Sequence, residues 1–297
     1  MRTIFAAMAA LLLAAAPAAA AEDWRKLLDP ASLAEMQSEG ATLLDIRSAR
    51  EYATAHIPGA VNAPYGAWRG PAENPGEPLD DARLTALLQV LGITPESRVV
   101  VAHAGVDRTD FGAAARVYWT LKSAGLDRIA ILNGGTRGWV AAGRPLSVEP
   151  TVPEPSKARF SLSEDWTADS GEIARAVSGD RAATLVDARP EDFHAGEAKH
   201  PAAEKAGTIP GSRNLLHETW FGEDPTEIGP AERVAALADA AGIGGEGEVV
   251  SFCNTGHWAA TNWFALSELA GIEDVKLYPE SMVGWTREGR PVEAPAD

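Results

Sequence analysis

The sequence contains one cysteine, and it lies where nucleophilic chemistry is expected. Cys253 directly follows the apolar run 249–252 and opens the loop Cys253-Asn254-Thr255-Gly256-His257-Trp258. The stretch 258–270 behind the loop has the mixed polar and apolar pattern of a helix. In a strand–loop–helix unit, the loop N–H groups and the helix N-terminus point toward one spot and favour negative charge there. A thiol at that spot gains the thiolate character that nucleophilic sulfur chemistry requires.

The alternative is a buried and inert cysteine, the usual state of a free thiol. Gly256 fits the reactive loop, because it lets the backbone curl without a Cβ clash. The loop argues against a cysteine phosphatase, whose phosphate-binding arginine lies six residues after the cysteine, because this position is Ala259. One cysteine also excludes an intramolecular disulfide and a multi-cysteine metal site.

The elements around this loop occur twice in the chain. Motifs of the first half recur in the same order roughly 150 residues later, which indicates a tandem duplication. The matching segments are 43–47 with 185–189, 56–62 with 208–214, 91–93 with 241–243, and 133–139 with 279–285. Prolines cluster between the two units, and proline-dense segments behave as linkers. We expect domains at 22–145 and 161–297, joined by a linker at 146–160.

Each unit alternates short apolar runs with longer mixed runs. This alternation predicts an α/β fold in which a mainly parallel sheet is flanked by helices, with ligands bound beyond the carboxyl ends of the strands. The predicted strands are 42–46, 98–102, 128–132, 183–187, 249–252 and 274–277. The predicted helices are 84–91, 109–124, 231–241 and 258–270.

The repeat resembles the rhodanese family of sulfurtransferases, which includes thiosulfate and 3-mercaptopyruvate sulfurtransferases. The matching pieces are Asp187-Ala188-Arg189, the Ile-Pro-Gly-Ser segment 209–212, the cysteine loop and Gly284-Trp285. The resemblance covers both halves of the chain, essentially all of residues 24–292. The resemblance implies two rhodanese-like domains, of which only the C-terminal one is catalytic.

The resemblance also implies a mechanism. Cys253 takes a sulfane sulfur from a small anionic donor, holds it as a persulfide, and passes it to a thiol, cyanide or protein acceptor. The amides of Asn254, Thr255, Gly256, His257 and Trp258 stabilise the extra sulfur. No metal or organic cofactor is implied.

Arg189 lies in the family's Asp-x-Arg motif, which implies that it binds the anionic donor, since its fork suits a sulfonate or carboxylate. The alternative is a structural salt bridge with Asp187, whose expected role is to orient the loop. Asp45 and Arg47 hold the same positions in the first half, where we expect the structural role to dominate.

The cysteine loop departs from both substrate types of the family. Thiosulfate-type members carry basic residues there, and mercaptopyruvate-type members carry small neutral residues ending in Val-Thr. His257 either supplies a positive charge or a proton near neutral pH, or starts the helix facing water. Trp258 either shapes an apolar wall of the site or packs, and we expect it to pack. The donor and the acceptor therefore stay open.

Two other segments leave alternatives open. Residues 194–206 form an insertion with Lys199, His200 and Lys205, which is either a lid over the donor or a surface insertion. In the first half His103 stands in place of Cys253, so sulfur transfer there is excluded. The loop after His103 either touches the second domain's site or faces solvent.

The first 21 residues have the pattern of a signal peptide. Arg2 is followed by the apolar run 4–16 and by Ala19-Ala20-Ala21. The alternative is an uncleaved anchor. No other segment is suited to cross a bilayer, so we expect a periplasmic or secreted protein without stable membrane insertion after cleavage.

Charge and composition limit the partners. The chain has 26 Lys and Arg against 42 Asp and Glu, a net charge of -16, which argues against nucleic acid. A non-catalytic periplasmic sulfur carrier or partner-binding module is the second hypothesis for function.

Overall fold

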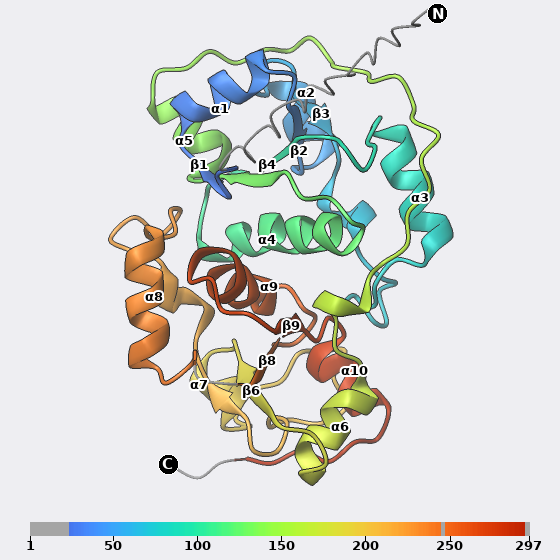
Figure 1. Ribbon diagram of the computed structural model, residues 1–297, viewed down its shortest axis with the longest axis vertical. Coiled ribbons are helices and arrows are strands. Elements are labelled where there is room, and N and C mark those ends of the chain that lie inside the picture. Colours follow the sequence, from blue (N-terminus) through green and yellow to red (C-terminus); the bar gives the residue numbers. More distant parts are fainter. Residues whose placement is uncertain (1–23, 245–246, 295–297) are drawn as a thin grey trace, which may run out of the picture.

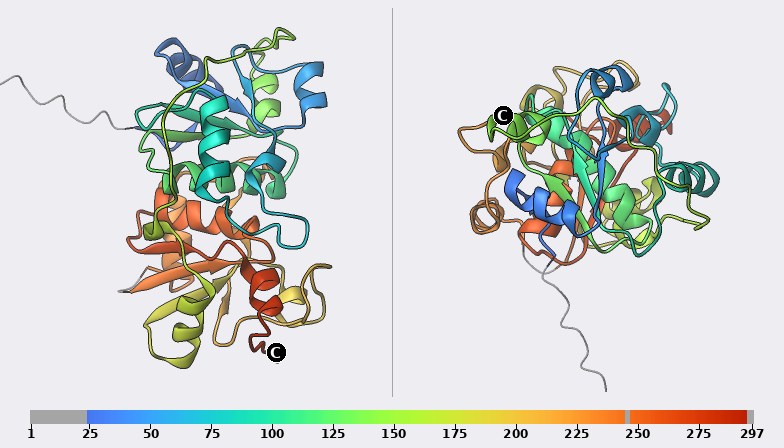
Figure 2. Two further views of the ribbon diagram at one scale, coloured as in Figure 1. Left: turned by 90° about the vertical axis from the view of Figure 1, so that its right-hand side faces the viewer. Right: turned by 90° about the horizontal axis from the view of Figure 1, so that it is seen from above.

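The computed structural model describes residues 24–244 and 247–294 as two α/β lobes stacked along the long axis of the molecule (Figure 1 and Figure 2). The predicted signal peptide lies outside the described residues. No helix in the described ranges has the length and apolar character needed to span a membrane.

The N-terminal lobe is built on five parallel strands in the order β1-β5-β4-β2-β3. Every residue of its central strand β4 is buried, as expected for a strand covered on both faces. The strands are β1 (Leu27–Leu28), β2 (Thr42–Asp45), β3 (Val61–Asn62), β4 (Val99–Ala102) and β5 (Ile129–Leu132). The helices are α1 (Pro30–Ser38), α2 (Ala49–Thr54), the 3-10 helix η1 (Tyr65–Trp68), α3 (Asp81–Val90), α4 (Arg108–Ser123) and α5 (Gly135–Ala141).

The C-terminal lobe repeats this plan with four parallel strands in the order β7-β6-β8-β9. The place of β1 is taken by a single parallel bridge between Thr167 and Leu277. The strands are β6 (Ala183–Asp187), β7 (Arg213–Asn214), β8 (Glu248–Phe252) and β9 (Val275–Leu277). The helices are η2 (Glu164–Trp166), α6 (Ser170–Ser178), α7 (Glu191–His194), η3 (His217–Trp220), α8 (Ala231–Ala240), α9 (Trp258–Trp263), its π-helical continuation η4 (Phe264–Leu269), and α10 (Ser281–Arg287).

These elements confirm the predicted fold class. Each predicted strand and helix is present, with ends that differ by a few residues. The largest difference is at helix 84–91, which begins earlier, at Asp81, because Asp80 caps the first turn through the amide of Arg83.

One hydrophobic cluster of buried residues contains side chains of both lobes, and each lobe also has a smaller cluster of its own. Helix α4 of the N-terminal lobe lies beside α9 of the C-terminal lobe at the centre of Figure 1. Phe111 and Tyr118 of α4 meet Phe264 edge-on, with ring centroids 5.8 and 5.0 Å apart. Aromatic pairs of this kind add to the burial of apolar surface, so the two lobes are packed as one unit.

Residues 146–160, predicted as the linker, run along the outside of the N-terminal lobe (Figure 1). Ser147 forms an antiparallel bridge with His56, and Ser156 N donates to Gln89 O at 2.9 Å. The chain then enters the C-terminal lobe near η2. The exact domain boundary stays a prediction.

Candidate active site

Cys253 lies at the carboxyl end of β8, in the middle of the C-terminal sheet. Its side chain is only 1% exposed. The loop that it opens is covered by the N-terminal lobe, which contributes hydrogen bonds to Thr255, Gly256, His257 and Trp258. The predicted nucleophile is therefore enclosed between the two domains.

Ser281 ties the cysteine loop to the start of α10. Its Oγ accepts hydrogen bonds from the amides of Cys253 (3.0 Å) and Gly256 (3.1 Å) and donates one to Tyr278 O (2.8 Å). Ser281 has a φ of +52°, a left-handed conformation that is costly for a residue with a Cβ atom. The corresponding position of the N-terminal lobe is Gly135, with a φ of +57°. In the C-terminal lobe a serine in this strained conformation thus bonds to two amides of the cysteine loop.

Four of the five predicted sulfur-stabilising residues keep an unpaired amide. The Gly256 N–H is directed to Ser281, whereas the amides of Asn254, Thr255, His257 and Trp258 have no hydrogen-bond acceptor among the residues described. Successive unpaired amides in a tight loop can hold negative charge. Their role toward the sulfur stays a prediction.

Asp187 and Arg189 form a buried ion pair at the end of β6. Arg189 Nε and Nη2 donate to the two carboxylate oxygens at 2.8 and 2.6 Å. Thr208 Oγ1 donates to the same carboxylate at 2.7 Å, and His194 Nδ1 lies 3.0 Å from it. Burial raises the pKa of Asp187, but the hydrogen bonds from Arg189, His194 and Thr208 outweigh it and lower the pKa overall.

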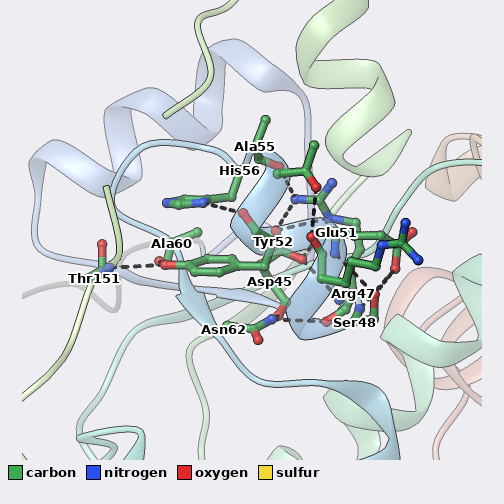
Figure 3. Close-up of polar contacts among 12 residues, drawn as sticks. Asp45, Arg47, Ser48, Glu51, Tyr52, Ala55, His56, Ala60, Asn62 and Thr151 are labelled. Atoms are coloured by element: carbon green, nitrogen blue, oxygen red, sulfur yellow. Dashed lines mark hydrogen bonds and ion pairs between the residues drawn. The ribbon is translucent and has the colours of Figure 1, made fainter. Parts of the chain in front are cut away.

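The N-terminal lobe holds the same arrangement without a nucleophile (Figure 3). Arg47 Nε and Nη2 donate to Asp45 at 2.9 and 2.5 Å, and Nη2 also donates to Ala55 O at 2.9 Å. In the C-terminal lobe Arg189 Nη2 likewise donates to Gly207 O at 3.0 Å. Because the geometry recurs where no sulfur chemistry is possible, it points to a structural role at the strand end.

Two of the three guanidinium nitrogens of Arg189, Nε and Nη2, therefore already donate hydrogen bonds within the protein. Its remaining nitrogen, Nη1, lies 3.5 Å from Asn254 Oδ1, so Arg189 also supports the cysteine loop. This geometry matches the salt-bridge alternative, and donor binding by Arg189 stays a prediction.

His257 joins the loop to the N-terminal lobe through both ring nitrogens. Its Nε2 lies 2.7 Å from Thr109 O, and a carbonyl only accepts, so Nε2 carries the proton. Its Nδ1, 2.9 Å from Tyr65 Oη, then accepts from the tyrosine hydroxyl. Burial, with the nearby Arg69, lowers the pKa of His257 to about 3. His257 is the N-cap residue of α9, so it does start the helix, but its ring nitrogens are bonded to the N-terminal lobe instead of facing water. The lowered pKa argues against a positive charge near neutral pH, and a role in proton transfer stays a prediction.

Trp258 packs, as the sequence predicted. Its ring stacks on His217 with centroids 4.9 Å apart, and Phe193 meets it edge-on at 6.2 Å. Its Nε1 donates to Thr109 Oγ1 at 3.3 Å. Burial lowers the pKa of His217 to about 4, so this ring is also neutral.

The N-terminal lobe also contributes two arginines, which the sequence analysis missed. Arg69 Nη2 donates to Thr255 O at 2.8 Å, and Arg116 Nη1 donates to Gly256 O at 3.3 Å. For Arg116 the sequence does contain a signal, since it is a lone charge within the apolar stretch 111–121 of a predicted helix. Arg69 and Tyr65 carry no comparable signal.

The structure gives contacts for the loop after His103 and for the insertion 194–206, whose roles the sequence did not decide. The loop after His103 ends at the domain interface, where Arg108 Nη1 donates to Glu218 Oε2 at 3.1 Å. The insertion 194–206 is tied to the end of α10, since Glu204 N donates to Thr286 Oγ1 at 3.0 Å and Lys205 Nζ donates to Gly289 O at 3.2 Å.

With this geometry described, the family of the protein is defined. Both lobes match the rhodanese-like domain family, over residues 29–142 and 170–288, and the chain belongs to that family. Its relatives are named for sulfur transfer, which indicates that the protein is a sulfurtransferase.

Two relatives and one solved structure illustrate the similarity. The chain is 32% identical over 263 residues to "Thiosulfate sulfurtransferase" of Azotobacter vinelandii, covering 87% of this chain and 93% of that protein. It is 31% identical over 255 residues to "Putative thiosulfate sulfurtransferase" of Mycolicibacterium smegmatis, covering 83% and 87%. The wild-type structure of EanB superimposes with a TM-score of 0.80 at 21% identity, covering 92% of this chain and 70% of that one, and shows the shared fold.

Proposed function

We propose that the protein moves a sulfane sulfur from a small anionic donor to a thiophilic acceptor through a persulfide on Cys253. Thiosulfate is the first donor to test, because relatives that match most of the chain are named for it. 3-Mercaptopyruvate is the second.

The transfer balances without a further reactant. The Cys253 thiolate attacks the outer sulfur of thiosulfate, a new S–S bond forms, and the electron pair of the broken S–S bond leaves with sulfite. The persulfide carries one negative charge, as the thiolate did. Cyanide or a thiolate then attacks the outer sulfur, leaves with it, and restores the Cys253 thiolate.

The observation that carries this proposal is the loop around the sole cysteine. Cys253 is buried at a strand end. The amides of Asn254, Thr255, His257 and Trp258 have no acceptor among the described residues, so they are free to donate to a negatively charged sulfur. An enclosed site strengthens each of these interactions, because water does not screen them.

The direct test is thiocyanate formation from thiosulfate and cyanide by the wild type and by Cys253→Ser. We expect saturable turnover in the wild type and none in the variant, with unchanged far-UV circular dichroism and thermal midpoint. Normal turnover by Cys253→Ser would exclude the mechanism.

The same assay tests the second hypothesis. A sulfur carrier would fail to turn over with thiosulfate and with 3-mercaptopyruvate, yet would accept a stable persulfide from a protein partner.

We also propose that the protein is exported. Cleavage after Ala21 leaves Glu22 at the N-terminus, so the mass of the protein recovered from a cell fractionation tests this proposal.

A further inference from the structure

Arg116 is a buried cation without a carboxylate in ion-pair contact anywhere in the described parts of the chain. It lies in the middle of α4 and its side chain is 0% exposed. Nη1 and Nη2 donate to two backbone carbonyls, Gly256 O at 3.3 Å and Gly76 O at 2.9 Å, and Nε has no hydrogen-bond partner. The guanidinium also lies over the ring of Trp119, 4.7 Å from its centroid. An uncompensated buried charge is costly, so a negative charge is expected beside it at some stage of function.

The groups within electrostatic reach of Arg116 identify that charge. Burial, with the nearby Arg69, lowers the pKa of Arg116 to about 9, while negative charge on Tyr65, Cys253 and Glu280 raises it. Arg116 is therefore still protonated at neutral pH. Burial raises the pKa of Tyr65, so its hydroxyl stays neutral. Glu280 makes no ion pair with Arg116 among the described residues. Its carboxylate accepts from the Asn74 side-chain amide at 2.6 Å, and burial raises its pKa. Of these three groups, Cys253 is the one whose anionic form takes part in the proposed reaction.

Arg116 also fixes the direction of a loop amide. In a trans peptide the C=O and the N–H point in opposite directions. Because Arg116 holds Gly256 O, the N–H of His257 in the same peptide points away from the N-terminal lobe. This amide is one of the four without an acceptor.

We propose that Arg116 is the counter-charge of the persulfide anion on Cys253, that Arg69 is the second cation of the same lobe, and that the N-terminal domain thereby completes the active site. The inference rests on the proposed function. Arg116 acts through the loop rather than by touching the donor, so it is a positioning residue. Arg69 reaches the loop one residue earlier, at Thr255 O.

The test compares the thermal midpoint of the protein with and without the persulfide. Each protein is loaded with thiosulfate, freed of excess donor, and checked by intact mass for one added sulfur. In the wild type, loading is expected to raise the midpoint. In Arg116→Met it should lower the midpoint, and the loaded fraction at a fixed thiosulfate-to-sulfite ratio should fall roughly tenfold. Arg116→Lys keeps the charge and should keep the sign of the shift.

Arg287→Met is the matched control. Arg287 also donates to a carbonyl of the other lobe, Glu73 O at 3.3 Å, but not to the cysteine loop. Loading with sulfur should raise the thermal midpoint of Arg287→Met as much as that of the wild type. If Arg116 has only a structural role, Arg116→Met should have lower midpoints both with and without the persulfide. The difference between these two midpoints should then equal that of the wild type.

Three outcomes decide the inference. A gain in Arg116→Met equal to the wild-type gain overturns it while leaving the proposed function intact. If Arg116→Met does not fold, Arg69→Met replaces it, and a wild-type gain in that variant likewise overturns the inference. A wild type that acquires no sulfur from thiosulfate, 3-mercaptopyruvate or a persulfide-bearing protein overturns the proposed function together with the inference.

Discussion

Gly256 of the cysteine loop and Arg116 of α4 are in direct contact across the domain interface. Gly256 O accepts from Arg116 Nη1 at 3.3 Å, and the loop residue has a φ of +68°. A Cβ atom at this position would collide with Arg116 Nη1 and with Pro279 O. The shape of the cysteine loop therefore depends on a residue 140 positions earlier in the chain.

Gly256→Ala should displace the loop and abolish most sulfur transfer, because the collision involves a backbone carbonyl and a buried side chain. Gly271→Ala is the control, since Gly271 has a φ of +70° but nothing within 4 Å of its would-be Cβ. Both variants carry about 1–3 kcal/mol of backbone strain, measured by denaturant unfolding. Gly256→Ala with the turnover of Gly271→Ala would show that the contact is unimportant.

Substitutions of Ser281 separate its hydroxyl from its backbone strain. Ser281→Ala keeps the left-handed Cβ and leaves two buried amides without an acceptor, which should cost about 1–3 kcal/mol. Ser281→Gly removes the same hydroxyl but relieves the strain, so it should be more stable than Ser281→Ala by about 1 kcal/mol. Both should slow sulfur transfer. Equal stabilities would contradict the strain that we assign to this residue.

Arg189→Ala leaves the buried carboxylate of Asp187 without its cation, and unfolding free energy should fall by about 3–5 kcal/mol. Arg47→Ala is the matched control, because Arg47 makes the same contacts to Asp45 in the lobe that lacks a nucleophile. Similar losses in both would support a structural pair. An increase in the KM for thiosulfate confined to Arg189→Ala would support donor binding instead.

Acid should destabilise the protein through His257 before its carboxylates titrate. The pKa of His257 is about 3 in the folded chain against an ordinary 6.5, so between these values the unfolded state binds a proton that the folded state does not. This contribution is complete above pH 6.5 and is lost as the pH falls toward 3. His257→Gln should therefore lose less stability than the wild type between pH 7 and pH 5. If the difference in thermal midpoint between His257→Gln and the wild type is the same at pH 7 and pH 5, the neutral state of the ring in the folded protein is refuted.

The fold was predictable because its strands and its duplication both leave local patterns in the sequence. Short apolar runs such as 98–102 and 249–252 are typical of buried parallel strands, and the duplicated motifs fix the same order of elements twice. The position of Cys253 at the carboxyl end of a strand was predictable because the apolar run 249–252 comes directly before it. Its role as the nucleophile stays a prediction.

The contribution of the N-terminal lobe was not predictable in the same manner. Tyr65, Arg69 and Arg116 reach the loop from 140 to 192 residues away, and nothing local in the sequence specifies the partner of an isolated side chain. The His257 ring is bonded to Thr109 and Tyr65 of the same lobe, and the sequence alone could not specify these partners. Ser281 could have been singled out from the sequence, because in the repeat it aligns with Gly135, a residue type that favours the left-handed conformation.

The central claim is a persulfide on Cys253, and intact-mass analysis of the purified protein tests it most directly. After incubation with thiosulfate, we predict that the wild type gains the mass of one sulfur atom, that cyanide removes it, and that Cys253→Ser gains nothing. A wild type without added sulfur, or a Cys253→Ser variant that gains it, would contradict the account.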